Sequence, residues 1–230
     1  NALSQFVAQH KLDPSLTYFW VCDYVIRQTD VKSDLAHLGD CVAAIGHTVL
    51  LLEPWDKPTP LGRSYCLKEG VATQKSGAKF DVVMSEAQQA AFEEALGDSV
   101  GGGFESIQAA ISAVDVRTAE CRNAEDQAAI RSELEAIGAS ECNALVVGLM
   151  REQLARQARA ALAKVPEAER ATSVKIHQVA KLLREQGNLA EAEPLSREQV
   201  KGCREKLGAR HQQTLSAVMN LALLLKKQGK

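Results

Sequence analysis

The sequence predicts an α/β domain with a mainly parallel sheet, then a helical connector, then an all-α solenoid of helical hairpins. Strand-length apolar runs alternate with helical patterns in residues 1–104, as in parallel sheets covered by helices. All ten aromatic residues lie between Phe6 and Phe104, so the composition changes near that point. The last third repeats itself at a spacing of 42 residues, which is typical of repeat architectures. We therefore expect three parts, at residues 1–104, 105–166 and 167–230.

The first part contains three candidate strands. Residues 17–22, 47–52 and 79–84 are near-continuous apolar runs, which are typical of strands buried on both faces. A helix is predicted before the second strand, because apolar residues recur there at helical spacing. They are Leu35, Leu38, Val42 and Ile45. Gly46 should end this helix, since glycine readily adopts the left-handed conformation of a helix C-terminus. Similar stripes predict helices over residues 3–10 and 91–96.

The middle part, to Val165, has a mostly helical pattern, and Pro166 should end it. Within it, residues 114–116 fit a short edge strand. Residues 101–103 are three consecutive glycines. We interpret them as a flexible connector, since no strand directly precedes them and no G-x-G-x-x-G spacing is present.

The last part contains the repeat. A shift of 42 residues aligns seven matching positions between residues 176–187 and 218–229. The first copy predicts a helix that ends at Gly187. The chain turns there into a second predicted helix, over residues 189–207. Pro194 lies near the start of that second helix and should bend it locally without breaking it.

A repeated helical hairpin predicts a solenoid, in which each hairpin buries its apolar face only against its neighbours. Ala180 and Ala192 are small where the two helices of the first hairpin must approach closely. Because a solenoid generally needs three or more repeats, we expect the array to continue beyond Lys230.

Charge and composition disfavour several classes of function. The formal net charge is −2, so no overall positive field would hold nucleic acid through its phosphates. No stretch approaches the roughly 18 consecutive apolar residues of a membrane-spanning helix. We expect neither a membrane span nor a targeting segment, and membrane association only peripherally, through partners.

The cysteines and histidines predict no metal site. The six cysteines are scattered without a C-x-x-C pair, which predicts reduced thiols in an intracellular protein. His37 and Cys41 lie one helical turn apart, with His47 shortly after, but a zinc site needs three or four ligands at defined spacing. The expected location is the cytoplasm, with an organelle left open.

Three segments of the last part resemble the 42-residue tetratricopeptide repeats of kinesin light chains. They are A-x-L-L-x-x-Q-G-x-L-x-E-A-E-P-L at 180–195, E-K-L-G-x-x-H at 205–211 and L-A-x-L-L-x-x-Q-G-K at 221–230. The chain holds about one and a half such repeats. The repeat-defining residues are Ala180, Leu183, Gly187, Ala192, Ala222, Leu225 and Gly229. The resemblance implies a module that binds peptides or partner proteins. Ser196 stands where the family often has an aromatic residue, so anchoring of peptides on aromatic side chains is not implied.

The repeats are also basic. Residues 173–230 carry 11 Lys and Arg against 5 Asp and Glu, which would attract an acidic partner. The candidate partner-binding residues are Lys181, Arg184, Arg197, Lys201 and Arg204. The alternative interpretation is an ordinary solvated helix face.

The first part resembles Toll/interleukin-1 receptor (TIR) domains. The segment L-L-L at 50–52, followed by P-L-G-R-S-Y-C-L-K-E at 60–69, is similar to the strand and S-x-W-C-L-x-E-L motif of that family, with Tyr65 in place of tryptophan. The resemblance implies a flavodoxin-like parallel sheet, here without its first strand. In NAD-cleaving members the glutamate of this motif is catalytic, and by position it is Glu69. A carboxylate there would stabilise an oxocarbenium-like centre.

Three functions follow as hypotheses. The first is a protein-interaction adaptor or structural subunit of a larger assembly, without a cofactor. The second is an NAD glycohydrolase that uses Glu69, with NAD as its substrate. The third, a motor cargo adaptor, is disfavoured because the chain has no heptad run for the coiled coil it would need.

Overall fold

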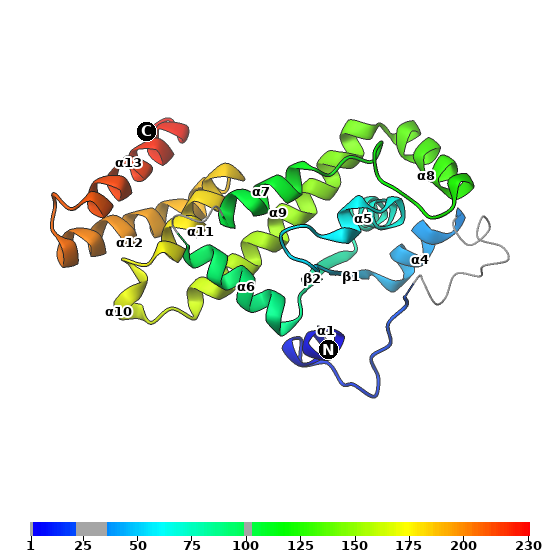
Figure 1. The fold of residues 1–230 in the computed structure, drawn as a ribbon, viewed down its shortest axis with the longest axis horizontal. Helices are drawn as coiled ribbons and strands as arrows, with labels where there is room; N and C mark the ends of the chain where they lie inside the picture. The colour runs from blue at the N-terminus through cyan, green and yellow to red at the C-terminus, as the bar shows by residue number, and fades with distance from the viewer. Residues whose placement is uncertain (1, 22–35, 99–102) are drawn as a thin grey trace. The chain divides into compact units, whose positions relative to one another are not determined.

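A computed structural model describes residues 2–21, 36–98 and 103–230, and shows a mostly helical chain with one small parallel sheet (Figure 1). The chain divides into two compact units. The first comprises residues 1–90 and 107–153, and the second comprises residues 91–106 and 154–230. The domain boundaries expected from the sequence, at residues 104 and 166, stay predictions.

The sheet of the first unit pairs β1 (His47–Leu51) with β2 (Lys79–Val83) in parallel, with His47 opposite Lys79 and Leu51 opposite Val83. Both strands were predicted as apolar runs. The helix predicted before the first of them is also confirmed as α4 (Leu38–Ile45), which ends at Gly46 with φ +71°. Glycine populates this left-handed region without steric cost. Leu35, the first residue of that predicted stripe, lies outside the described residues.

The crossover between the strands consists of the 3₁₀ turn η1 (Thr59–Gly62) and α5 (Ser64–Ser76). A parallel pair requires such a connection, because the chain must return to the starting edge. Thr73 of α5 is fully buried, and its Oγ1 lies 2.7 Å from Oγ1 of Thr48 in β1. The helix is therefore fixed to the sheet by a polar contact as well as by apolar burial of Leu67 and Val71.

The remaining helices of the first unit include α1 (Ala2–Gln9) and α8 (Ala124–Ile137). Three further helices contribute residues to both units: α6 (Glu86–Gly97), α7 (Gly103–Ser112) and α9 (Ala139–Ala163). The apolar core of the first unit includes Leu38, Leu52, Leu67, Ile111, Ile130 and Leu134.

Two predicted strands are wrong over the described residues. Residues 17–21 form no strand: Phe19 packs against Phe6, with ring centroids 6.0 Å apart, and Tyr18 is 87% exposed. An apolar run becomes a strand only where a neighbour completes its hydrogen bonds. Cys22, the last residue of that run, lies outside the described residues.

Residues 114–116 form no strand either, because Asp115 closes a local turn. Its carbonyl accepts hydrogen bonds from the amides of Thr118 and Ala119, and its side chain accepts from the amide of Arg117 over 3.0 Å. Aspartate side chains commonly accept hydrogen bonds from nearby backbone amides, and such turns compete with pairing of the segment as a strand. Of the connector predicted at residues 101–103, Gly101 and Gly102 lie outside the described residues, and Gly103 is the first residue of α7 (Gly103–Ser112).

The second unit ends in four helices: α10 (Glu167–Arg170), α11 (Val174–Glu185), α12 (Leu189–Leu207) and α13 (Gln212–Lys227). Pro166 follows the end of α9, as predicted, and α12 continues through Pro194. The core of this unit includes Phe92, Leu96, Leu154, Leu162, Ile176 and Val179. Figure 1 shows α11, α12 and α13 in chain order, coloured from yellow to red.

Candidate functional site

The caps and turns of α11, α12 and α13 set where these helices begin. Ser173 caps α11, since its Oγ accepts a hydrogen bond from the amide of Ile176 over 3.3 Å. Gly187, at φ +84°, turns the chain into α12, in a conformation that other residues rarely adopt. His211 caps α13, with Nδ1 accepting from the amide of Gln213 over 3.2 Å. As a result α12 packs against both α11 and α13.

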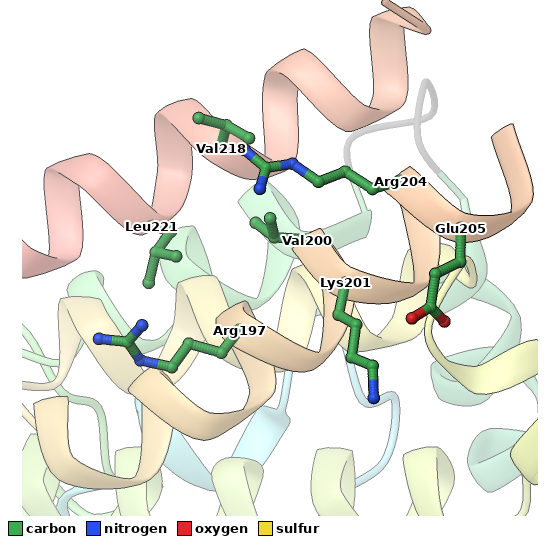
Figure 2. A pocket seen from close by; sticks show the side chains of 7 residues that line it. All are labelled: Arg197, Val200, Lys201, Arg204, Glu205, Val218 and Leu221. Atoms are coloured by element: carbon green, nitrogen blue, oxygen red, sulfur yellow. The ribbon is translucent and has the colours of Figure 1, made fainter. Parts of the chain in front are cut away.

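A groove of about 450 Å³ runs between α12 and α13 (Figure 2). Val200, Val218 and Leu221 give it an apolar floor. The charged residues that line it all come from α12: Arg197, Lys201, Arg204 and Glu205. In Figure 2, Arg204 extends towards Val218, whereas Lys201 extends the opposite way. Three cations face one carboxylate, so the local field favours an anionic ligand.

The three cations do not contribute equally to the positive charge of the groove. Arg197 pairs with Glu193 over 2.8 Å, and Glu193 also pairs with Lys230 over 2.9 Å. Hydrogen bonds from Lys230 and Arg197 lower the pKa of Glu193 to about 2. Glu193 is therefore ionised at neutral pH and offsets part of the charge of Arg197. Within the described ranges, neither Lys201 nor Arg204 forms an ion pair, so these two carry the positive charge of the groove.

The other two predicted partner-binding residues, Lys181 and Arg184, lie on α11 beside a second, much smaller cavity. Its volume of about 10 Å³ is far below that of small-molecule sites. Lys181 pairs with Glu105 over 3.2 Å. Burial and then the charge of Lys181 lower the pKa of His177, which also lines this cavity. The structure thus brings three of the five predicted cations together and places two elsewhere.

The repeat-defining residues lie in two kinds of environment. Ala180, Leu183 and Ala192 are buried. Gly187 and Gly229 both have positive φ, +84° and +75°, so the turn recurs after 42 residues. In the second copy, however, Ala222 is exposed and Leu225 is only half-buried.

The sequence did not single out the apolar part of this site. Val200, Val218 and Leu221 line the groove, and Leu215, Met219 and Leu223 of α13 are 57%, 60% and 49% exposed. Helical periodicity predicts that such residues face a neighbour. It does not say which neighbour is present. One signal was available in the sequence. Apolar residues lie around more of the circumference of α13 than contact with one neighbouring helix would bury.

Glu69, the candidate catalytic residue, is half-exposed on α5. Its backbone carbonyl accepts a hydrogen bond from Oγ1 of Thr73 over 2.7 Å. Because Thr73 also contacts Thr48 of β1, this turn of α5 is anchored to the sheet. Tyr65, one turn earlier, donates its hydroxyl hydrogen bond to buried Asp126.

Two histidines of the first unit, His10 and His47, lie beside the carboxylate of Asp81. Nε2 of His47 lies 2.8 Å from Oδ2 of Asp81, and Nε2 of His10 lies 3.9 Å from the same oxygen. The Phe6 ring packs 4.2 Å from that of His10. Within the described part of the chain, no group of three or more His, Cys, Asp or Glu side chains is arranged to hold a metal ion.

Comparison with known proteins adds no assignment. No protein-family model, curated protein or solved structure matches the chain. Among the helices of residues 2–21, 36–98 and 103–230, none is both long enough and apolar enough to cross a membrane.

Proposed function

We propose that the chain is a protein-interaction adaptor or a structural subunit of a larger assembly. In this proposal, residues 167–230 form a tetratricopeptide-type module that binds a partner protein in the α12–α13 groove. The observation that supports it is the apolar floor beneath Lys201 and Arg204, two cations without an ion pair in the described part of the chain. Apolar burial would supply affinity, and the cations would select and orient an acidic partner.

The first unit, in the same proposal, is a TIR-like domain that offers the assembly a second contact. The support is the order of its elements, with β1 followed by α5 and then by the parallel partner strand β2. The chain would then join two binding surfaces, which is what an adaptor requires.

The test is isolation of the tagged full chain from its own source under mild conditions, followed by native mass spectrometry. A stoichiometric partner is expected. It should be lost from a Lys201→Glu/Arg204→Glu variant and retained by an Arg122→Glu/Lys57→Glu variant, which changes the net charge equally at exposed positions of the first unit. Equal recovery of the partner by both variants contradicts the proposed use of the groove.

NAD cleavage is a second candidate, favoured by the half-exposed position of Glu69 on a helix anchored to the sheet. If the first unit is such an enzyme, purified chain should release nicotinamide from NAD, and Glu69→Ala should abolish the release. Glu135→Ala, which removes an exposed carboxylate of α8, is the matched control. Release that is unchanged in Glu69→Ala assigns the activity to another residue or to a contaminant.

A further inference from the structure

The small cavity beside α11 lies among three consecutive helices, α11, α12 and α13. Its volume of about 10 Å³ is close to what a single particle of the size of water requires. All of its lining side chains lie on these three helices, so no further helix is needed to form the cavity. The polar lining residues are His177, Lys181, Arg184, Ser196, Gln199 and Asn220.

The lining of this cavity is rich in hydrogen-bond donors. Lysine and arginine side chains only donate, each carboxamide offers two N–H groups, and a serine hydroxyl offers one donor. Two of the lining residues, Lys181 and Arg184, are cations, and among the described residues no Asp or Glu lines the cavity. The electrostatic potential inside the cavity is therefore positive, which favours an anion over water.

The two cations differ in whether a carboxylate offsets their charge. Lys181 pairs with Glu105 of α7 over 3.2 Å. The guanidinium of Arg184 forms neither an ion pair nor a hydrogen bond within residues 2–21, 36–98 and 103–230, although its backbone carbonyl accepts a hydrogen bond from Nζ of Lys227 over 2.9 Å. Arg184 is half-buried, so it brings an unneutralised positive charge to the wall of the cavity.

Gln199 adds an amide donor at a nearly buried position, since this residue is 4% exposed. Its side chain hydrogen-bonds to the ring of His177 and raises the pKa of that ring, so the amide oxygen is the accepting atom. The side chain of Gln199 forms no other hydrogen bond in the described part of the chain. Its amide nitrogen thus borders the cavity without an acceptor, which costs free energy unless a ligand accepts from it.

His177 responds to the positive charge around the cavity. Burial, then the charge of Lys181 and, to a smaller extent, that of Arg184 lower the pKa of its ring. Nearby cations disfavour the imidazolium form because they repel it. An anion held in the cavity would offset this repulsion and raise the pKa of His177 again.

We propose that this cavity binds a single monatomic anion, with chloride as the ligand. Arg184 supplies the charge that the ion neutralises, and the amide nitrogen of Gln199 donates a hydrogen bond to it, so that the ion joins α11 to α12. The volume of the cavity excludes phosphate and carboxylate groups, which are polyatomic. This site is separate from the α12–α13 groove and does not rest on the proposed function.

The first experiment measures thermal unfolding of the full chain by circular dichroism while chloride replaces gluconate at constant ionic strength. A ligand that binds only the folded chain raises its unfolding temperature, and we expect a rise of about 2–4 °C between about 5 and about 150 mM chloride. Arg184→Gln should abolish this rise, and Arg184→Lys, which keeps the charge, should retain part of it. Lys206→Gln removes an exposed cation of α12. It is the matched control and should respond to chloride as the parent chain does.

The second experiment detects binding directly, from the linewidth of the chloride NMR signal at pH 7. The parent chain and Lys206→Gln should broaden the signal, bromide should reverse the broadening by competition, and Arg184→Gln should not broaden it. The ring of His177, followed by NMR, should titrate at higher pH in chloride than in gluconate in the parent chain, and at the same pH in both salts in Arg184→Gln.

Two results would overturn the inference. If the parent chain does not broaden the chloride signal, the cavity does not hold the ion. If chloride raises the unfolding temperature of Arg184→Gln as much as that of the parent chain, the salt acts on the chain as a whole and not at this cavity. Neither result bears on the α12–α13 groove, whose test is recovery of the native partner.

Discussion

Tyr65 donates a hydrogen bond from its hydroxyl to Oδ2 of Asp126 over 2.7 Å, which joins α5 to the first turn of α8. Asp126 is 6% exposed, so its carboxylate depends on partners within the protein. Burial and then the hydrogen bond to Asp126 raise the pKa of Tyr65 above its usual range. Tyr65, the position at which the sequence departs from the TIR motif that it resembles, thus forms a structural hydrogen bond.

Replacing Tyr65 should test this contact directly. Tyr65→Phe leaves a buried carboxylate without that donor, which should lower the free energy of unfolding by about 1–3 kcal/mol. Urea denaturation at pH 7 measures the loss. Tyr18→Phe is the matched control, because Tyr18 is 87% exposed. A Tyr65→Phe chain as stable as the control contradicts a stabilising role for the bond.

The same tyrosine should make stability fall in alkali. Its pKa is raised in the folded chain, so the unfolded chain loses the proton first, near pH 10. The contribution is therefore full below about pH 10 and is lost as pH rises above it. Unfolding midpoints measured between pH 8 and 11 should decline less in Tyr65→Phe than in the parent chain. Parallel declines would show that other groups dominate.

His177 should make the stability of the chain fall as the pH drops into the mildly acidic range. Burial, then the neighbouring Lys181, lower its pKa in the folded chain, whereas the unfolded value is about 6.5. The unfolded chain then binds the proton first, so stability is full above about pH 6.5 and falls as the pH drops below it. His177→Gln should flatten this fall in urea midpoints between pH 7.5 and 5, and His37→Gln, at an exposed position, should not.

The close approach of α12 to Ala171 requires glycine at position 202. A Cβ built on Gly202 would overlap the Cβ of Ala171, which is attached to the backbone and cannot rotate away. Gly202→Ala should therefore destabilise the chain by about 1–3 kcal/mol, although alanine is the better helix former. Gly148→Ala, where a Cβ meets nothing within 4 Å, should be neutral or stabilising. Calorimetric unfolding of both variants measures the difference, and a stabilised Gly202→Ala chain would show that the backbone yields.

Enlarging the small residue of each repeat should separate the covered helix from the uncovered one. Ala180→Leu adds volume to a packed contact and should cost about 1–3 kcal/mol. Ala222→Leu, 42 residues later at an exposed position, should change stability by no more than about 0.5 kcal/mol. Urea denaturation of the two variants gives the comparison, and equal losses would mean that Ala222 is packed in solution.

The parts of the fold that follow from local sequence were predictable. Gly46 ends α4, Gly187 separates α11 from α12, and the runs at β1 and β2 become strands. In each case one glycine or one short pattern decides the outcome. Residues 17–21 have an equally apolar pattern, yet no strand forms there. Their outcome depends on the neighbours that fold beside them, which a local pattern does not contain.

For the candidate groove, too, one part could be predicted from the sequence and another part could not. The charge of Lys201 and Arg204 was apparent from sequence, because the repeats are basic. The apolar floor was not, since Val218 and Leu221 match residues of α11 that are fully buried. Only the arrangement of helices shows that these two remain accessible. Likewise Lys181 was grouped with the other cations, but its pairing with Glu105 depends on residues 76 positions apart.

The parallel pairing of β1 and β2 also constrains the order of folding. Pairing of the two strands closes the loop of residues 52–78, which costs chain entropy before the strand contacts repay it. We predict that docking of α5, through Leu67, Val71 and Thr73, accompanies formation of the sheet and offsets this cost. In native-state hydrogen exchange, the amides of α5 and of both strands should open together as one cooperative unit.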